Sequence, residues 1–502
     1  MERLIVLPML IPFFTAVTVL LLRRPMRIVR FVALIGALAE LGVNVGLLVR
    51  VSGGEVLVEQ IGNWPAPYGI SFVLDLFSAL MLTLTSVVGL VVLIYALGSM
   101  DGDRERLGFY SLYHFLLLGV CGSFLSGDLF NLYVFFEVML LSSFALMTLG
   151  GERGQLEGGL KYVVINMVSS TLLVSAVGII YGATGTLNMA DLSLRLAEAP
   201  PGLSTVLASM FIVAFGIKAG LFPLFFWLPA SYHTPPPAVS AVFAGLLTKV
   251  GVYALFRVFT LIFVQDTAYT HTLLLVLAGL TMVSGVLGAV AQYDVRRLLA
   301  FHIISQIGYM MMGLALFTPL ALLGAILHIG HNMMVKTSLF LIGGCMGRLR
   351  GTYDLKRMGG LLREQPRLAG LFLVAALSLA GLPPLSGFFS KYILVRAGIE
   401  SEQYLIVAVS LVVSLLTLFS MLKIWNEAFW KPALVPRNEA TAQLPSTVRQ
   451  HPSAWLLVAP VAVLVLLSIA LGLFAEGAYT LVLRAAEIML NPEIYRAAVL
   501  GR

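Results

Sequence analysis

The apolar run at residues 203–228 reads LSTVLASMFIVAFGIKAGLFPLFFWL. It is long enough to cross a bilayer, whose hydrocarbon core of about 30 Å requires about 20 apolar residues. A single lysine, Lys218, stands inside the run, shortly before Gly220 and Pro223. A glycine and a proline together predict that the helix is interrupted at this point. The stretch therefore predicts a broken membrane helix that carries a charged side chain.

The composition of the whole chain also indicates a membrane protein. Of the 502 residues, 59% are hydrophobic and 11% are charged, whereas soluble domains average about 25% charged residues. The mean hydropathy is +0.96. These values exclude an ordinary water-soluble protein. The first apolar run, residues 4–22, lacks a small-residue cleavage site, so we expect a retained helix and not a signal peptide.

Apolar runs bounded by charges, glycine or proline recur along the chain and predict an all-α polytopic membrane protein with about 14 transmembrane helices. The expected spans are residues 4–22, 28–49, 72–98, 107–126, 128–149, 160–182, 203–228, 236–264, 271–291, 298–317, 319–346, 368–398, 403–428 and 454–475. Residues 478–500 have a mixed pattern, which fits either an interfacial helix or a loosely ordered tail.

Two parts of the chain resemble each other at a distance of five spans. AGLFPL at residues 219–224 returns as AGLPPL at 380–385, and NMVSST at 166–171 returns as NMMVKT at 332–337. Because a repeat of five spans reverses its direction, we expect two inverted repeats, in spans 4–8 and 9–13, with spans 7 and 12 broken. The predicted units are residues 1–106 (spans 1–3), 107–264 (first repeat), 271–428 (second repeat) and 429–502 (last span and tail).

The basic residues in the loops predict the orientation. If the loop after the first span is cytoplasmic, about 19 Lys and Arg residues lie in the inner loops and about 7 on the outer side. The positive-inside rule then places the chain in a prokaryotic plasma membrane with both termini outside. The formal charge of +7 needs no nucleic-acid partner, because the basic residues form no stripe or binding motif.

The sequence shows no sign of redox or hydrolytic chemistry. Cys121 and Cys345 both lie in apolar segments and form no CxxC motif. We find no GxGxxG motif, P-loop or nucleophile elbow. We therefore expect that the chain binds no cofactor and no metal. We also expect that it is a transporter subunit and not an enzyme.

Ionisable residues inside the spans are the first candidates for function, because each costs at least about 2.5–3.5 kcal/mol to insert. Glu137 has apolar residues on both sides, and Lys218 precedes the predicted helix break. How firmly Lys218 holds a proton would depend on how near Glu137 lies. The alternatives are a structural ion pair for Glu137 and snorkelling for Lys218.

Other titratable residues extend this set along the chain. They are Lys249, Lys336 and Lys391, with His302, His328 and His331. A proton relay requires a series of such groups across the membrane. His328 and His331 face one side of a helix, so a metal pair or ordinary structural histidines are alternatives. The functional interpretation is weaker for Arg257, Lys423, Glu427, His114 and Asp75, for which packing or snorkelling is equally expected.

These motifs resemble the antiporter-like subunit family shared by respiratory complex I, membrane-bound hydrogenases and the multisubunit Mrp cation/proton antiporters. The resemblance covers nearly the whole chain and rests on FE at residues 136–137, GIKAGLFP at 216–223, LPASYH at 228–233, PPP at 235–237 and GLPPLSGFFSK at 381–391. Within the family, residues 227–253 and Lys391 are similar to the D-type group of Mrp antiporter subunits.

The resemblance implies 14 spans, with spans 7 and 12 broken, around a central hydrophilic axis. It implies that Glu137 and Lys218 form a coupling pair, that Lys249 lies on the inner route, and that Lys391 lies near the outward connection. The chain departs from some relatives at residues 305–308, SQIG, where those relatives carry a histidine. We therefore expect His302 or water to serve there.

The expected function is that of a proton-translocating subunit of an electrogenic Na⁺/H⁺ antiporter. Its expected partners are other hydrophobic subunits, protons, Na⁺ and the lipid bilayer. The lysines suit protons and suit Na⁺ poorly, because a sodium site needs several oxygen ligands and few fixed cations. The alternative is a proton-pumping membrane subunit of a redox complex, of the membrane-bound hydrogenase or NADH-quinone oxidoreductase type.

Overall fold

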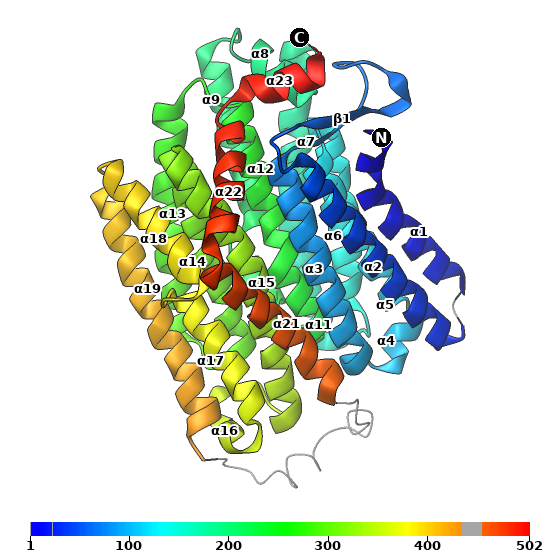
Figure 1. The fold of residues 1–502 in the computed structure, drawn as a ribbon, viewed down its shortest axis with the longest axis vertical. Helices are drawn as coiled ribbons and strands as arrows, with labels where there is room; N and C mark the ends of the chain where they lie inside the picture. Colours follow the sequence, from blue (N-terminus) through cyan, green and yellow to red (C-terminus); the bar gives the residue numbers. More distant parts are fainter. Residues whose placement is uncertain (1, 23, 433–453, 502) are drawn as a thin grey trace.

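The computed structural model describes residues 2–22, 24–432 and 454–501, and these form a bundle of long, roughly parallel helices (Figure 1). Within these residues, 12 helices are long and apolar enough to span a membrane. Two further expected spans correspond to shorter apolar helices, Phe109–Leu125 and Pro366–Ala380. The multi-span helical architecture is as predicted, and the count of 14 stays a prediction.

Within the described residues, the elements follow one another with a single short hairpin near the N-terminus. They are η1 (Glu2–Val6), α1 (Leu7–Leu22), α2 (Met26–Val51), β1 (Leu57–Gln60), η2 (Ile61–Asn63), β2 (Ser71–Leu74), α3 (Leu76–Ser99), α4 (Gly102–Arg106), α5 (Phe109–Leu125), α6 (Leu129–Thr148), α7 (Arg153–Thr184), α8 (Met189–Arg195), α9 (Pro201–Ala219), α10 (Trp227–Ser231), α11 (Pro237–Val242), η3 (Phe243–Leu247), α12 (Thr248–Leu261), α13 (Thr267–Ala291), α14 (Val295–Leu316), α15 (Pro319–Arg350), η4 (Leu355–Arg357), α16 (Leu361–Glu364), α17 (Pro366–Ala380), α18 (Ser386–Glu400), α19 (Tyr404–Ile424), η5 (Trp425–Trp430), α21 (Ala454–Leu473), α22 (Ala475–Met489) and α23 (Pro492–Leu500).

Both helices that were predicted to break do so, with the same backbone pattern. α9 ends at Gly220 and α17 ends at Gly381, and both glycines have the positive φ that favours glycine, 85° and 90°. The N–H of Gly220 donates to the carbonyls of residues 216 and 217, and that of Gly381 to residues 377 and 378. At each break, the glycine N–H therefore donates to helix carbonyl groups that would otherwise lack a hydrogen bond.

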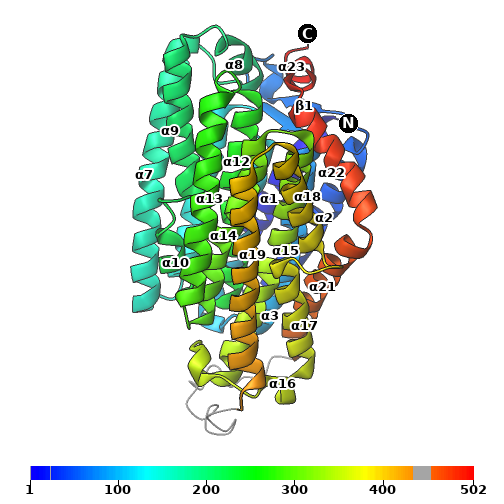
Figure 2. The same cartoon turned by 90° about the vertical axis from the view of Figure 1, so that its left-hand side faces the viewer.

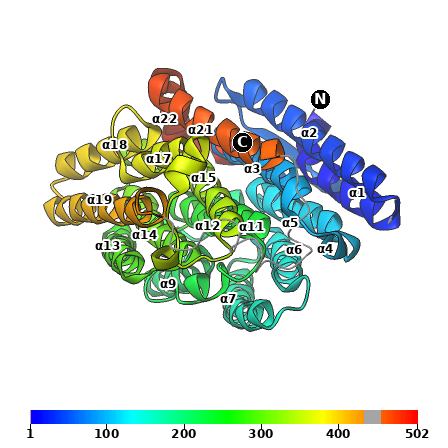
Figure 3. The ribbon, with the colours of Figure 1, turned by 90° about the horizontal axis from the view of Figure 1, so that it is seen from below.

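Three long segments lie at the centre of the bundle, as the view from below shows (Figure 3). They are α11 to α12 (Pro237–Leu261), α14 (Val295–Leu316) and α15 (Pro319–Arg350), whose apolar windows are 100%, 94% and 94% buried. The outer helices are far less buried, at 33% for α2 and 39% for α7, α13 and α19. Lysines and histidines on the three central segments therefore lie away from lipid.

The C-terminal segment is helical and packed against the rest of the protein. α22 rises along the bundle and α23 lies across its end, on the same side as the N-terminus (Figures 1 and 2). Arg484 Nη1 donates to the carbonyl of Ser52, and Arg496 Nε donates to Ser193 Oγ at 2.7 Å. Of the two alternatives for residues 478–500, the structure therefore shows ordered helices and not a loose tail.

The short hairpin modifies the predicted third span. β1 and β2 pair in antiparallel register, with Leu57 opposite Leu74. α3 starts at Leu76 and not at residue 72, because Asp75 caps it by accepting a hydrogen bond from the N–H of Ser78 at 2.8 Å.

Candidate functional site

Glu137 and Lys218 lie on neighbouring helices without forming an ion pair. Glu137 is on α6, and its Oε1 atom is buried without a hydrogen-bond partner. Lys218 is on the last turn of α9, where its Nζ atom donates to Ser170 Oγ of α7 at 3.1 Å. The two charges interact electrostatically, yet the ion pairs among the described residues do not include Glu137. A change in their separation therefore changes how strongly they attract.

The local sequence explains why the Lys218 ammonium lies at this point. Lys218 precedes the Gly220 cap, so it occupies the end of a helix, where free carbonyl groups favour a cation. Trp227, beyond the break, donates its indole N–H to the carbonyl of Ile217 at 3.0 Å. The ring of Phe136 lies 5.0 Å from the Lys218 Nζ atom. The break and its aromatic neighbours thus fix the position of the ammonium group.

Lys249 lies next to a short π-helical segment. The segment is η3 (Phe243–Leu247), and Lys249 Nζ donates to the carbonyl of Ala244 at 2.5 Å. π-Helical turns within α-helices occur frequently at functional sites. At Gly251, on the same helix α12, an added Cβ atom would lie 2.7 Å from the backbone nitrogen of Ala219. The glycine therefore allows the Lys249 helix to pack directly against the break beside Lys218.

Lys336 is a fully buried lysine of α15 whose Nζ atom has no hydrogen-bond partner. It interacts electrostatically with Lys249 and Lys391. No carboxylate neutralises it among the ion pairs of the described part of the chain. A proton on Lys249 or on Lys391 therefore disfavours a proton on Lys336.

His328 and His331 lie on the same helix, α15, and each contacts a serine of α18. His328 Nδ1 is 3.0 Å from Ser390 Oγ, and His331 Nδ1 is 2.8 Å from Ser386 Oγ. Their ring centroids are 5.7 Å apart, and both Nε2 atoms are buried without a partner. Among the described residues, no group of three His, Cys, Asp or Glu side chains is arranged to hold a metal ion. The pair stays compatible with a relay.

Lys391 follows the second helix break and is held by oxygen atoms. Its Nζ atom donates to the carbonyls of Leu379 and Ala380, at 3.0 and 3.2 Å, and to Ser414 Oγ at 3.1 Å. The Tyr309 ring lies 4.8 Å from this Nζ atom, and the Tyr309 hydroxyl is 2.8 Å from Ser414 Oγ. The ammonium thus binds the end of α17 in the way that Lys218 occupies the end of α9.

His302 lies on α14, just before residues 305–308, where the sequence departs from some relatives. Its Nε2 atom is 2.5 Å from Ser420 Oγ of α19, and its Nδ1 atom is buried without a partner. Gln306, one turn away, donates to Ser305 Oγ at 3.1 Å and leaves its own Oε1 unpartnered. Neither atom has a hydrogen-bond partner among the described residues.

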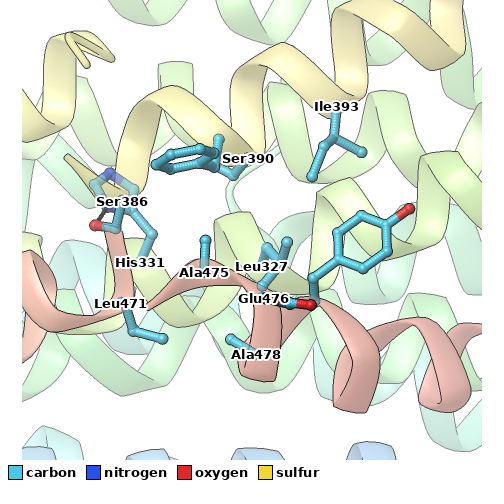
Figure 4. A pocket seen from close by; sticks show the side chains of 11 residues that line it. Leu327, His331, Ser386, Ser390, Ile393, Leu471, Ala475, Glu476 and Ala478 are labelled. Carbon is cyan, nitrogen blue, oxygen red and sulfur yellow. Dashed lines mark hydrogen bonds between the residues drawn. The ribbon is translucent and has the colours of Figure 1, made fainter. Parts of the chain in front are cut away.

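A pocket of about 150 Å³ opens beside this part of the bundle (Figure 4). His331, Ser386 and Ser390 line one part of it, and Glu476 and Tyr479 of α22 line another. Behind the pocket, the hydroxyls of Ser378, Ser386 and Ser468 lie within 2.8 to 3.3 Å of one another. The bend between α21 and α22 therefore leaves an open space next to a buried histidine.

Unpartnered polar atoms are a feature of Glu137, Lys336 and the three histidines, whereas Lys218, Lys249 and Lys391 have hydrogen-bond partners. Burying a polar atom without a partner is costly and rare in proteins, so such atoms mark water or function. They are Glu137 Oε1, Lys336 Nζ, His302 Nδ1, His328 Nε2 and His331 Nε2, with Thr248 Oγ1, Gln306 Oε1 and Asn332 Oδ1 beside them. The structure thus collects the sequence candidates around the central helices and leaves several of them free to bind water.

The sequence did not single out the hydroxyl groups that contact these residues. They are Ser170, Ser386, Ser390, Ser414, Ser420 and Tyr309. Serine is common in membrane helices, and its position in the sequence does not show which side chain it will contact. Only the helix packing identifies these partners.

Arg257 and Asp75 form a separate, closed structural pair. Arg257 Nη1 is 2.6 Å from Asp75 Oδ2, and both residues are buried. Arg257 also donates to Ser78 Oγ and the Tyr253 hydroxyl, and its guanidinium lies 5.3 Å from the Tyr495 ring of α23. Since every group has a partner, this pair joins α3, α12 and the C-terminal helix. Packing is therefore the interpretation that the geometry favours for it.

A cavity of about 530 Å³, with several charged side chains in its lining, lies at the end of the bundle that was predicted to be cytoplasmic. Glu157, Lys161, His233 and Arg297 line it. His233 Nε2 is 3.1 Å from Arg297. Burial, with Arg297 and Arg296 nearby, lowers the pKa of His233 to about 4. His233 is therefore neutral at pH 7, and both of its ring nitrogens have partners, since its Nδ1 atom lies 2.9 Å from the carbonyl of Pro229.

The sequence of the chain matches known protein families. A family model described as "NADH:quinone oxidoreductase/Mrp antiporter, TM" matches residues 126–417, and a model described as "NADH-Ubiquinone oxidoreductase (complex I), chain 5 N-terminus" matches residues 64–110. The chain is 49% identical, over the full length of both, to the D-type subunit of the Na⁺/H⁺ antiporter of Alkalihalophilus pseudofirmus.

Two solved structures share its fold over the full length of both chains. One is a chain of the Mrp complex from Dietzia sp. DQ12-45-1b, with a TM-score of 0.92 and 34% identity. The other is a chain of the membrane-bound sulfane sulfur reductase, an archaeal respiratory membrane complex, with a TM-score of 0.91 and 25% identity. The fold is thus found both in an antiporter complex and in a respiratory complex.

Proposed function

Because the chain belongs to the NADH:quinone oxidoreductase/Mrp antiporter transmembrane family, we propose that it is the proton-translocating subunit of a multisubunit electrogenic Na⁺/H⁺ antiporter. It would lie in a prokaryotic plasma membrane with both termini outside, in contact with other hydrophobic subunits. Its two five-helix units, residues 107–264 and 271–428, would be inverted repeats that each supply one broken helix. As a transporter subunit it would bind and move ions without covalent catalysis.

The observation that supports this proposal most is the unpartnered Lys336 ammonium between Lys249 and Lys391. A lysine that served only packing would be expected to have a carboxylate or carbonyl partner. Repulsion of Lys336 by Lys249 and by Lys391 instead favours states in which Lys336 and either neighbour are not protonated together. A proton that arrives at one lysine then displaces a proton from the next, through bridging water.

The proposed route starts at Glu137 and Lys218, whose attraction is set by their separation. When Glu137 moves away, Lys218 loses its nearest opposite charge and releases its proton more readily. The proton would pass to Lys249, which the Gly251 contact holds beside the Lys218 break. One charge that crosses 100 mV is worth about 2.3 kcal/mol, which is within the range of such a local rearrangement.

The second half of the route would contain Lys336, the histidines and Lys391. His328, His331 and His302 each bind a serine hydroxyl through one ring nitrogen and leave the other free. A neutral imidazole in this arrangement can accept a proton on one side and pass one on from the other. The pocket that His331 and Glu476 line would give this end of the route an opening.

Substitution of the coupling pair tests the proposal. Glu137→Ala and Lys218→Ala should each abolish Na⁺-driven pH change in everted vesicles while the complex still assembles. Glu157 and Lys161 are the matched controls, since they form an exposed Lys–Glu pair at 2.5 Å on α7. Their alanine variants should exchange at the normal rate. Retained exchange in an assembled Glu137→Ala or Lys218→Ala variant would refute the assignment.

The proton pump of a redox complex is the second candidate, favoured by the likeness to the sulfane sulfur reductase chain. The same axis would then be driven by electron transfer in partner subunits. Purification of the chain from its native membrane in mild detergent, followed by mass spectrometry, separates the two. Small hydrophobic partners alone indicate the antiporter, whereas iron–sulfur or nickel proteins indicate the redox pump.

A further inference from the structure

Glu40 is a buried carboxylate of α2 that the lysine axis does not use. It is 0% exposed, and its Oε1 atom accepts a hydrogen bond from Cys121 Sγ at 3.2 Å. Its Oε2 atom has no partner. Within the described part of the chain, no Lys, Arg or His side chain forms an ion pair with it. If ionised, this carboxylate would need a cation that the protein itself does not provide.

The packing of α2 on α3 brings further oxygen atoms to Glu40. Asn44 Nδ2 donates to the carbonyl of Leu82 at 3.1 Å, and Thr83 Oγ1 donates to the carbonyl of Asn44 at 3.2 Å. The two helices run in opposite directions (Figure 1). Glu40 is one turn before Asn44, so it lies at the level of the residues one turn after Leu82, among them Thr85.

The packing of α5 on α3 places Cys121 at the same level. The Tyr113 hydroxyl donates to the carbonyl of Gly89 at 2.7 Å, and a Cβ atom at Gly89 would lie 3.3 Å from Leu117. Cys121 is one turn further along α5 than Leu117. α3 and α5 also run in opposite directions. A step of one turn forward on α5, from Leu117 to Cys121, therefore corresponds to a step of one turn back on α3, from Gly89 to Thr85.

Three oxygen atoms of this cluster are buried and unpartnered. They are Glu40 Oε2, Asn44 Oδ1 and Thr85 Oγ1, all on residues that are 0% exposed. A carboxylate, an amide oxygen and a hydroxyl are the ligand types that hard cations such as Na⁺ prefer. The described residues hold no group of three His, Cys, Asp or Glu side chains for a transition metal here.

We infer that Glu40, Asn44 and Thr85 form a binding site for Na⁺ in the N-terminal helices, apart from the lysine axis. The inference rests on the proposed antiport function and gives that function an ion site with oxygen ligands and no fixed cation. Bound Na⁺ would neutralise the Glu40 carboxylate. When Na⁺ leaves, a proton on the same carboxyl group keeps the site neutral, so the site exchanges one ion for the other.

A cavity of about 270 Å³ lies between this site and the end of the bundle that was predicted to be cytoplasmic. Glu105, Tyr110 and Ser111 line it. From Ser111 to Cys121, α5 rises by about 15 Å. On that stretch His114 has a buried, unpartnered Nδ1 atom. His114 is therefore a buried polar group between this cavity and Glu40, on the side that was predicted to be cytoplasmic.

The first test measures the Na⁺ concentration for half-maximal antiport in everted vesicles that contain the complete complex. Glu40→Gln and Thr85→Val should each raise it by about tenfold or more, because each removes one oxygen ligand. Thr85→Val keeps the side-chain shape and removes a hydroxyl that makes no hydrogen bond, so it should not disturb folding. Asp191→Asn is the matched control.

The control carboxylate differs from Glu40 in its partners. Asp191 is buried on α8, and its Oδ2 atom accepts a hydrogen bond from Arg195 Nε at 2.8 Å. Its asparagine variant should keep the normal Na⁺ dependence if the complex assembles. An unchanged half-maximal Na⁺ concentration in assembled Glu40→Gln or Thr85→Val complexes would overturn the Na⁺ site.

The second test measures ion binding at Glu40 without measuring transport. A hydrophobic carbodiimide modifies protonated carboxyl groups in membranes, and mass spectrometry quantifies the adduct on Glu40. NaCl should slow this modification relative to choline chloride in the complete complex. Equal modification in both salts would contradict Na⁺ binding. If the complex carried out no Na⁺/H⁺ exchange, the proposed function would fail, while protection of Glu40 by Na⁺ would still show the site.

Discussion

Lys218 Nζ lies 3.1 Å from Ser170 Oγ, a neutral partner, while Glu137 nearby forms no ion pair among the residues that the structure describes. A direct ion pair would hold the proton on the ammonium and fix both helices. A serine partner keeps the ammonium oriented and leaves its attraction to Glu137 dependent on distance. The arrangement therefore suits a site that must change its protonation during transport.

Removal of the serine hydroxyl should slow the coupling step without abolishing it. Ser170→Ala takes away one hydrogen bond to a charged group, so we expect antiport to slow by about twofold to tenfold. Ser175 is the matched control, because it is an exposed serine on the same helix whose hydroxyl bonds to the carbonyl of Thr171. Rates in everted vesicles, normalised to assembled complex, give the comparison. A normal rate in Ser170→Ala would show that the contact is incidental.

The close approach of α18 to α15 should depend on Gly387. A Cβ atom there would lie 2.9 Å from His331 Nε2 and closer still to the carbonyl of Ser378. Gly387→Ala should therefore separate these helices, destabilise the complex by about 1–3 kcal/mol and impair transport. Gly370→Ala on α17, where nothing lies within 4 Å, should do neither. Thermal stability in detergent measures the difference, and equal stability of the two variants would argue against this packing.

The Arg257–Asp75 pair should matter for stability more than its exposed counterparts. Arg257→Gln leaves a buried carboxylate without its partner, a change that costs about 3–5 kcal/mol in comparable sites. Arg396→Gln, which breaks an exposed pair with Glu400, should change little. The melting temperature of the purified complex, measured for both variants and the wild type, gives the comparison. A small loss for Arg257→Gln would mean that the pair is not a structural link.

His233 should take no part in proton transfer near neutral pH, because both of its ring nitrogens already have partners, the carbonyl of Pro229 and Arg297. Its pKa is lowered to about 4 by burial and by the adjacent Arg297 and Arg296, so the folded protein holds it neutral. His233→Gln should therefore leave the pH profile of antiport unchanged between about pH 6 and about pH 8. Between its lowered pKa and the ordinary value of 6.5, the unfolded chain binds a proton at His233 more readily than the folded protein does. The wild type should therefore lose stability relative to the variant as the pH falls from 6.5 towards 4. A shifted transport profile would contradict this.

The sequence predicted the membrane bundle, because its signal is strong and local. Long apolar runs, their glycine and proline interruptions at Gly220 and Gly381, and isolated lysines such as Lys218 are visible without any knowledge of packing. The two broken helices appear where the repeated AGLFPL and AGLPPL segments predicted them. Span boundaries were less certain, since α3 begins at an Asp75 cap that hydropathy does not register.

Features that depend on contacts between distant helices were not predictable. The sequence does not distinguish the serines that bind His328, His331 and Lys391 from other serines. Their role becomes visible only when α18 and α19 pack against the central helices. Glu40 is a different case. It is a lone acid in an apolar span, so the rule that selected Glu137 applies to it equally, yet it was overlooked among the sequence candidates.

The relay through the central lysines is tested most directly at Lys336, whose ammonium lacks the partner that a packing role would require. The measurement is the rate of Na⁺-driven pH change in everted vesicles that contain assembled complex with Lys336→Ala, compared with the exposed control Lys161→Ala. If protons pass along this line, Lys336→Ala should lose exchange and Lys161→Ala should keep it. A normal rate in assembled Lys336→Ala complexes would contradict the proposed relay.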